Sequence, residues 1–340
     1  MMERQFYLDN ISAILIAYMI FIVHLTYFCP VQGSIIDMLR SLLYFFMAWF
    51  FFKSGMFYKD KPIKAVIKSS AKRLLVPWAV FNVIGIVVMG LQAYRGLGLS
   101  LFPPLLNSIE VIAFNEAIWA DLPLWFLLSL FAVRVAFAIL YKCRVNAWAL
   151  LIIFLAATIF IHYTCYVSWK GMDNLPFTIL DHHLPENVLL IVGNICYGSL
   201  FYTLGYILQT KQYNRPVVII ACLAFVAHLF YPIDIDTRII DTPNMPLIIF
   251  FCLAGIIVAD NVFKRYLNRS VMILTYVGRN SMTYYIVHYL LFYFTFRVAL
   301  PQYKFSGVGY YLLFSVITIV LLYGVDKLFN MKALHWMIGK

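Results

Sequence analysis

One histidine stands well inside the first hydrophobic stretch of the chain. The run from Ile11 to Phe28 carries no Lys, Arg, Asp or Glu, and His24 is its only side chain that ordinarily titrates near neutral pH. An imidazole in a membrane segment loses its hydration, so it normally needs a partner or a wet cavity. Such a group suits a general base. The alternative is a purely structural role, in which His24 is packed and hydrogen-bonded to a Ser, Thr or Tyr of a neighbouring helix.

Two further ionisable side chains fall inside apolar runs. His288 lies in GRNSMTYYIVHYLLFYF, where a structural role that bonds across helices is the simpler interpretation. Arg134 lies in LWFLLSLFAVRVAFAIL, where burial is costly unless the guanidinium is paired or hydrated. Arg134 therefore either lines a cavity or extends toward the interface.

A dense basic cluster separates the second and third hydrophobic runs. KSGMFYKDKPIKAVIKSSAKRLLVP places seven Lys or Arg within 21 positions, including Lys68, Lys72 and Arg73. It is either a loop that touches anionic lipid or an anion site, at the cytoplasmic mouth, for the phosphates of a soluble cofactor. Lys72 and Arg73 favour the anion site because they abut the start of a helix, and an Arg offers bidentate donors to phosphate.

The elements that must position these residues are membrane helices. Only 12% of the 340 residues are charged, against about 25% in soluble domains. A spanning helix needs about 20 apolar residues, and ten windows come close. They lie at 10–29, 36–57, 74–94, 124–141, 146–163, 188–208, 216–231, 245–260, 281–300 and 308–327. The sequence predicts an all-α polytopic bundle of about ten helices, forming one domain over residues 1–340.

The distribution of positive charge predicts the orientation. With both termini in the cytoplasm, 19 of the 26 Lys and Arg residues lie on the inner side. The net charge of +11 therefore mainly reflects Lys and Arg in the cytoplasmic connections of a membrane protein, and no nucleic-acid partner is expected. The long outer connections at 95–123 and 164–187 combine aromatics with carboxylates, which suits sugars but is equally typical of ordinary interfacial loops. No metal site is predicted, because His182-His183 has no third ligand at helical spacing.

Five stretches, in chain order, resemble the acyltransferase family 3 membrane proteins, which move acyl groups onto glycans. They are YLDNI with the apolar run to His24, FFMAWFFFKSGMFY, KRLLVPW, LPLWFLLSLF and GRNSMTYYIVHYLL. The resemblance implies a multi-pass protein of the bacterial inner (plasma) membrane. It would transfer an acyl group, with acetyl expected, from coenzyme A on the cytoplasmic side to a hydroxyl of a cell-surface or lipid-linked glycan.

The resemblance also assigns roles to residues. His24 would deprotonate the acceptor hydroxyl or carry the acyl group briefly, and Lys68, Lys72 and Arg73 would hold the cofactor phosphates. The supporting residues that it implies are Asp9, Trp125, Arg134, Arg279, Asn280 and His288.

One position departs from the family pattern. The family usually carries Arg, sometimes Lys, eleven residues before the histidine of the first helix, where this chain has Ala13. Aligned on the preceding LDN, that Arg would fall at Ser12, and His24 comes one residue late. Either the register is shifted, or a charge comes from Arg134 or Arg73, or activity is lost.

Two other functions remain open from the sequence. A polytopic transporter or exporter of a glycan or small solute fits ten helices with intramembrane His and Arg, although no inverted repeat is visible. An inactive relative within a polysaccharide assembly machine fits the missing Arg. The sequence leaves the acceptor, the acyl group and the oligomeric state undetermined.

Overall fold

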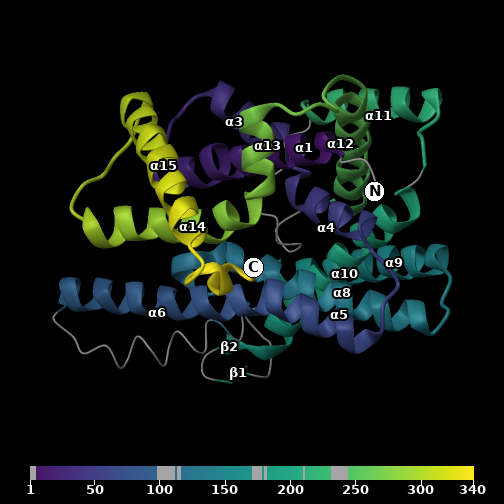
Figure 1. Ribbon diagram of the computed structural model, residues 1–340, viewed down its shortest axis with the longest axis horizontal. Coiled ribbons are helices and arrows are strands. Elements are labelled where there is room, and N and C mark those ends of the chain that lie inside the picture. The colour runs from purple at the N-terminus through teal and green to yellow at the C-terminus, as the bar shows by residue number, and fades with distance from the viewer. Residues whose placement is uncertain are drawn as a thin grey trace. The chain divides into compact units, whose positions relative to one another are not determined.

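The computed structural model describes residues 5–97, 112, 116–170, 178–179, 182–209, 211–230 and 244–340 (Figure 1). These residues are overwhelmingly helical, and the all-α prediction is confirmed. Within these ranges the only strands are β1 (Thr178–Ile179) and β2 (His182–His183), which pair antiparallel. Most of the predicted outer connection at 95–123, and residues 171–177, 180 and 181 of the one at 164–187, fall outside the described residues.

Each of the ten predicted windows coincides with helix. Seven helical stretches of the described chain are long and apolar enough to cross a membrane. They are Phe6–Phe28, Ser34–Met56, Ile63–Gly96, Trp119–Lys142, Ile191–Leu208, Met245–Tyr266 and Val308–Phe329. The apolar helices Ala147–Tyr163 and Arg215–His228 are shorter, and residues 281–299 combine an α-helix with a π-helix. The chain is a multi-pass integral membrane protein.

The helices form two compact units, each assembled from three separate segments. Unit 1 comprises Met1–Ile11, Ser41–Lys68 and Ser129–Ser270. Unit 2 comprises Ser12–Arg40, Ser69–Leu128 and Val271–Lys340. No single cut in the sequence separates them.

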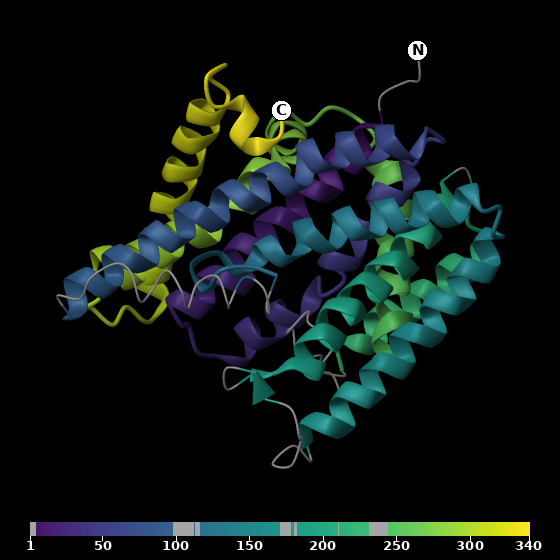
Figure 2. The ribbon, with the colours of Figure 1, turned by 90° about the horizontal axis from the view of Figure 1, so that it is seen from below.

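Unit 1 is built from regular α-helices. They are α4 (Phe46–Met56), most of α5 (Ile63–Ser70), the greater part of α8 (Trp125–Lys142), α9 (Ala147–Lys170), α10 (Leu184–Leu208), α11 (Arg215–His228) and α12 (Met245–Tyr266). Helix α10 packs along both α4 and α9, as Figure 2 shows for α9 and α10, and α11 packs on α12.

Reciprocal glycines bring α4 and α10 together. A Cβ added to Gly55 would lie 1.9 Å from the carbonyl oxygen of Tyr202, and one added to Gly205 would lie 2.0 Å from that of Phe52. Small residues permit such close backbone contact between membrane helices. Any larger side chain at either glycine would force the two helices apart.

The LDN sequence anchors the start of α1 (Phe6–Ala17) within unit 1. The side-chain amide of Asn10 donates to the carbonyl oxygens of Leu267 (2.8 Å) and Arg269 (3.1 Å), just beyond α12. Lys53 Nζ donates to the carbonyl oxygen of Leu8 at 3.3 Å. These bonds fix the beginning of the helix that carries His24.

Unit 2 combines α-helices with less regular turns. Its α-helices are the end of α1, α2 (Thr26–Phe28), most of α3 (Ser34–Leu42), α6 (Val76–Leu97), α13 (Met272–Arg279), α14 (Ser281–Tyr293) and α15 (Val308–Phe329). Its π-helices are η1 (Tyr18–Leu25), η2 (Ala71–Leu75) and η4 (Phe294–Ala299). Its 3-10 helices are η3 (Trp119–Leu124) and η5 (His335–Ile338).

Polar contacts tie α6 to α14 and η4. Arg95 donates from Nη1 to the carbonyl oxygen of Val298 at 2.7 Å. The Tyr293 hydroxyl donates to Oε1 of Gln92 at 2.6 Å. Both bonds lie at the C-terminal end of α6, and they hold the helix alongside the one that carries His288.

Candidate functional site

Two histidines from opposite ends of the chain meet in unit 2. Nδ1 of His24, on η1, lies 2.7 Å from Nε2 of His288, on α14. The two rings are within 15° of parallel, and the Tyr289 ring meets His24 edge-on. His288 is fully buried, whereas His24 is partly exposed. His24 is therefore the less enclosed residue of the pair.

Backbone carbonyls determine which nitrogen carries each proton. Nδ1 of His288 lies 3.0 Å from the carbonyl oxygen of Tyr284 and 2.8 Å from that of Tyr285. A carbonyl can only accept, so Nδ1 of His288 holds the proton, and its Nε2 is left as an acceptor. His24 must then donate from its own Nδ1, which leaves Nε2 of His24 with a free lone pair.

The π-helix η1 bears on the late position of His24. An α-helix completes about three turns in eleven residues, at 3.6 residues per turn. A π-helix takes about one more residue per turn, so the twelve positions from Ser12 to His24 also amount to about three turns. This geometry favours the shifted register among the three explanations, and the shift stays a prediction. Ser12, where alignment on LDN expects the family Arg, is fully buried.

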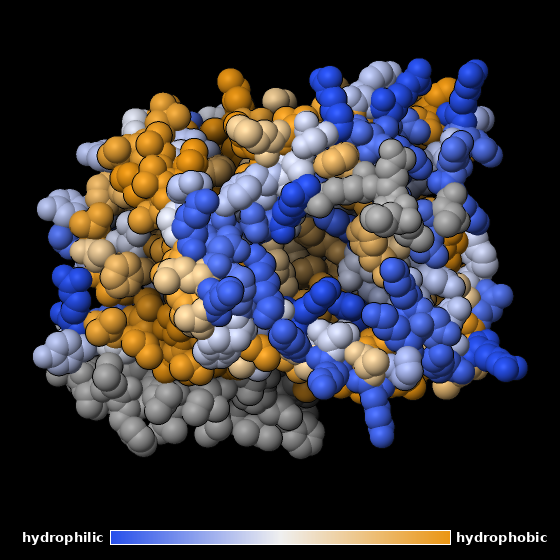
Figure 3. All heavy atoms as spheres, viewed as in Figure 1, coloured by the Kyte–Doolittle hydropathy of each residue, from blue (hydrophilic) through white to orange (hydrophobic). Residues whose placement is uncertain are grey.

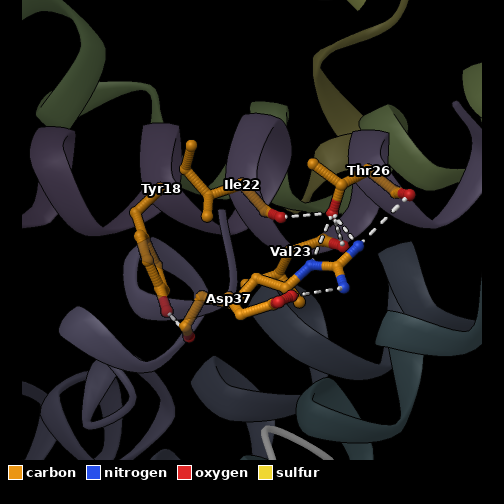
Figure 4. A network of polar contacts seen from close by, with 6 residues as sticks. Tyr18, Ile22, Val23, Thr26 and Asp37 are labelled. Atoms are coloured by element: carbon orange, nitrogen blue, oxygen red, sulfur yellow. Dashed lines mark hydrogen bonds and ion pairs between the residues drawn. The ribbon is translucent and has the colours of Figure 1, made fainter. Parts of the chain in front are cut away.

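Arg40 braces η1 from the following helix (Figure 4). Its guanidinium donates to Oγ1 of Thr26 from Nε (3.1 Å) and from Nη2 (2.9 Å), and the Tyr18 hydroxyl donates to its carbonyl oxygen. Asp37 lies 3.9 Å from Nη1. Thr26 donates in turn to the carbonyl oxygen of Ile22 at 2.6 Å. One residue thus contacts both ends of the π-helix.

The LPLWF stretch supports His288 through Tyr285. The Tyr285 hydroxyl donates to the carbonyl oxygen of Pro123, and its ring packs against Phe126 with centroids 5.4 Å apart. Trp125, a predicted supporting residue, is buried edge-on against Phe126. Tyr285 supplies a carbonyl to His288, so this motif orients the histidine indirectly.

Asp121 is an unpaired acid close to this support. It is fully buried, and neither carboxylate oxygen has a hydrogen-bond partner in the described part of the chain. Its backbone is non-helical within η3, at φ −149° and ψ 60°. A buried carboxyl without partners is costly, and such groups concentrate at functional sites. The sequence analysis placed residues 95–123 in an outer loop, whereas Asp121 lies in a helical turn.

Three distant segments form a basic cluster at the start of α6. Lys72 and Arg73 are exposed on η2. Gly339 packs on their backbone: a Cβ there would lie 2.7 Å from both Cα of Arg73 and the carbonyl oxygen of Lys72. Lys340 Nζ then reaches Oδ1 of Asn280 at 3.5 Å. Figure 1 shows this yellow C-terminal turn beside α6. The sequence analysis missed Lys340, because no motif surrounds it.

The other predicted residues are distributed between the units. Arg279 is exposed at the end of α13 in unit 2, next to Asn280. In unit 1, Lys68 is exposed on α5 and Asp9 is half-buried on α1. Arg134 lies within hydrogen-bonding reach of the Tyr202 hydroxyl, also in unit 1. The roles predicted for these residues stay predictions.

A comparison with family models decides the relationship of this chain to known proteins. The model described as an acyltransferase domain matches residues 5–326, which is nearly the whole chain. The chain belongs to the acyltransferase 3 family. The resemblance expected from the five sequence stretches is thereby confirmed. No curated protein and no solved structure matches this acyltransferase.

Proposed function

We propose that this membrane acyltransferase moves an acyl group, with acetyl expected, from coenzyme A at the cytoplasmic side to a hydroxyl of a cell-surface or lipid-linked glycan. A bacterial inner membrane is the proposed location. One observation carries the proposal: inside a membrane helix, Nδ1 of His24 lies 2.7 Å from Nε2 of His288. The carbonyl contacts of His288 make its Nε2 the acceptor, which leaves Nε2 of His24 as the basic atom.

In the proposed step, Nε2 of His24 takes the proton of the acceptor hydroxyl while that oxygen attacks the thioester carbonyl. The new carbon–oxygen bond forms, the carbon–sulfur bond breaks, and His24 returns the proton to the leaving sulfur. His288 accepts from Nδ1 of His24 throughout, which holds the ring and stabilises the imidazolium. No other group needs to change its protonation state.

Binding of the donor is assigned to the basic cluster. Lys72, Arg73 and Arg279 are exposed cations in unit 2 that can meet the phosphates of coenzyme A. Lys68, predicted for the same role, lies in unit 1 and stays a weaker candidate. A planar guanidinium at Arg73 can contact one phosphate through two parallel bonds.

The test is His24→Asn, with His24→Ala beside it. The Asn amide can replace the Nδ1 donor toward His288, but it offers no base in place of Nε2. Both variants should express and melt like the parent, while surface glycans lose the acyl-sized mass increment in mass spectrometry. Unchanged acylation in His24→Asn would remove His24 from the mechanism.

Reconstituted vesicles distinguish the competing functions. The enzyme transfers label from radioactive acetyl-coenzyme A to glycan, and the parent protein should do so. Passage of unmodified glycan without transfer would favour an exporter. Coenzyme A binding by calorimetry, with neither transfer nor transport, would favour an inactive relative.

A further inference from the structure

A groove with a volume of about 460 Å³ runs along unit 2. Its walls come from α1, η1, α13, α14 and α15, and nine of the thirteen lining side chains are aliphatic, Met or Phe. The volume lies within the range of about 300–1,000 Å³ that is usual for ligand sites. Among its lining residues, Phe21 and Tyr284 are each within about one helical turn of a site histidine in the sequence.

Polar groups gather at one rim of the groove. Tyr276, Tyr284, Tyr323 and Lys327 line it, the Tyr276 and Tyr284 hydroxyls contact each other, and the Lys327 ammonium lies over the Tyr323 ring, 5.2 Å from its centroid. The hydrogen bond to Asp326, together with burial, raises the pKa of Tyr276 to about 12. Asp326 itself is fully buried beneath this rim. The rim therefore presents tyrosine hydroxyls and the exposed ammonium of Lys327.

The groove opens beside the lipid-facing surface of α15. This helix is a membrane span with few buried residues, and Val320, next to the groove residue Ile319, is 64% exposed. Figure 3 shows the hydrophobic surface over α15. The positive-inside rule places the Lys327 end of α15 at the cytoplasmic leaflet, where anionic phospholipids concentrate.

We infer that the groove binds an anionic phospholipid of the cytoplasmic leaflet, with an acyl chain along its apolar walls and the phosphate at Lys327. Lipid tails are as apolar as the helix surface, so the chain gains little by leaving the bilayer. Selectivity must come from the head group. A basic residue at an anionic membrane surface contributes about 1 kcal/mol, which corresponds to about a five-fold preference.

The test uses the purified full-length protein in nanodiscs that contain equal amounts of phosphatidylglycerol and phosphatidylcholine. Native mass spectrometry after ejection counts the retained lipids. We expect retention of phosphatidylglycerol, and about a five-fold loss of that preference in Lys327→Gln. Lys332→Gln, which removes an exposed lysine outside the groove, should keep the preference.

A second pair of variants tests whether the lipid chain lies along the apolar walls of the groove. Ile319→Trp fills the groove from its exposed wall and should abolish lipid retention, whereas Val320→Trp places the same ring outside it. Equal losses in Lys327→Gln and Lys332→Gln, or retained lipid in Ile319→Trp, would overturn the inference. Displacement of the lipid by added coenzyme A would also overturn it, because the groove would then belong to the acyl donor.

Discussion

The two units differ in how they use their helices. In unit 1, α4 and α10 are regular and approach until glycine is required at Gly55 and Gly205. All three π-helices found in the described residues belong to unit 2, and η1 carries His24. In unit 1, regular helices make close backbone contact with each other. In unit 2, π-helical turns change the direction in which side chains such as that of His24 project.

This difference has a physical basis in the membrane. Lipid provides no hydrogen bonds, so an irregular backbone is tolerated only where protein contacts or a cavity replace them. At η1, the Thr26 hydroxyl donates to the carbonyl oxygen of Ile22, and Nη2 of Arg40 donates to the carbonyl oxygen of Thr26 just beyond it. π-Helical turns are frequent at functional sites. The irregular unit is therefore the one in which chemistry is expected.

The largest effect should follow from breaking the contact between α4 and α10. Gly55→Leu places a side chain against the backbone oxygen of Tyr202, which cannot move without separating the helices. Overpacking of a core costs about 1–3 kcal/mol and occasionally more, of a total stability of about 5–15 kcal/mol. We expect almost no monodisperse protein in fluorescence-detected size exclusion.

Gly324→Leu is the matched control for that substitution. Gly324 lies on α15 of unit 2, with no atom near its added Cβ. This variant should elute like the parent. Equal yields of the two variants would contradict the importance of close packing in unit 1.

A smaller effect, on rate alone, should follow from changing His288. His288→Leu removes the acceptor for Nδ1 of His24, and the acyl-transfer rate should fall by about 10²–10⁴-fold without loss of folded protein. His288→Gln offers an amide oxygen near the position of Nε2, and we expect it to restore most of the rate. If Gln is as inactive as Leu in single-turnover assays, His288 does more than orient His24.

The smallest effect should appear at the basic cluster. Gly339→Ala adds a Cβ against Lys72 and Arg73 at a φ of +71°. If these residues bind the donor, the KM for acyl-coenzyme A should rise about two- to five-fold, in line with the loss of an exposed ion pair, at unchanged kcat. Gly307→Ala is the control, because its φ is +92° but its added Cβ meets nothing. A KM shift of equal size in both variants would reflect backbone strain alone.

The sequence predicts the helices well because lipid imposes a simple requirement. Each span must satisfy its own backbone, so continuous apolar runs mark it, and all ten windows coincide with helix. The same pattern identified His24, since a titratable ring is conspicuous in an apolar run. Pattern alone could not pair it with His288, which lies 264 positions away.

The local geometry of the site was also beyond pattern analysis. A π-helix leaves no composition signal in YMIFIVHL, so the sequence could not show the wider turn that favours a shifted register for His24. Gly339 and Lys340 stand outside every recognised stretch, and only folding brings them to Lys72 and Arg73. The family resemblance suggested acyl transfer, and the structure identified the residues that contact His24 and the basic cluster.

The wider turn in η1 also affects how relatives should be aligned. Adding a residue to an ordinary membrane helix rotates every later side chain toward a different neighbour. If η1 absorbs such a residue, a homologue with one residue fewer between its LDN motif and its histidine would place the imidazole in the same position. Counting positions from a shared motif would then misjudge which side chains are equivalent, whereas superposing the helices would not.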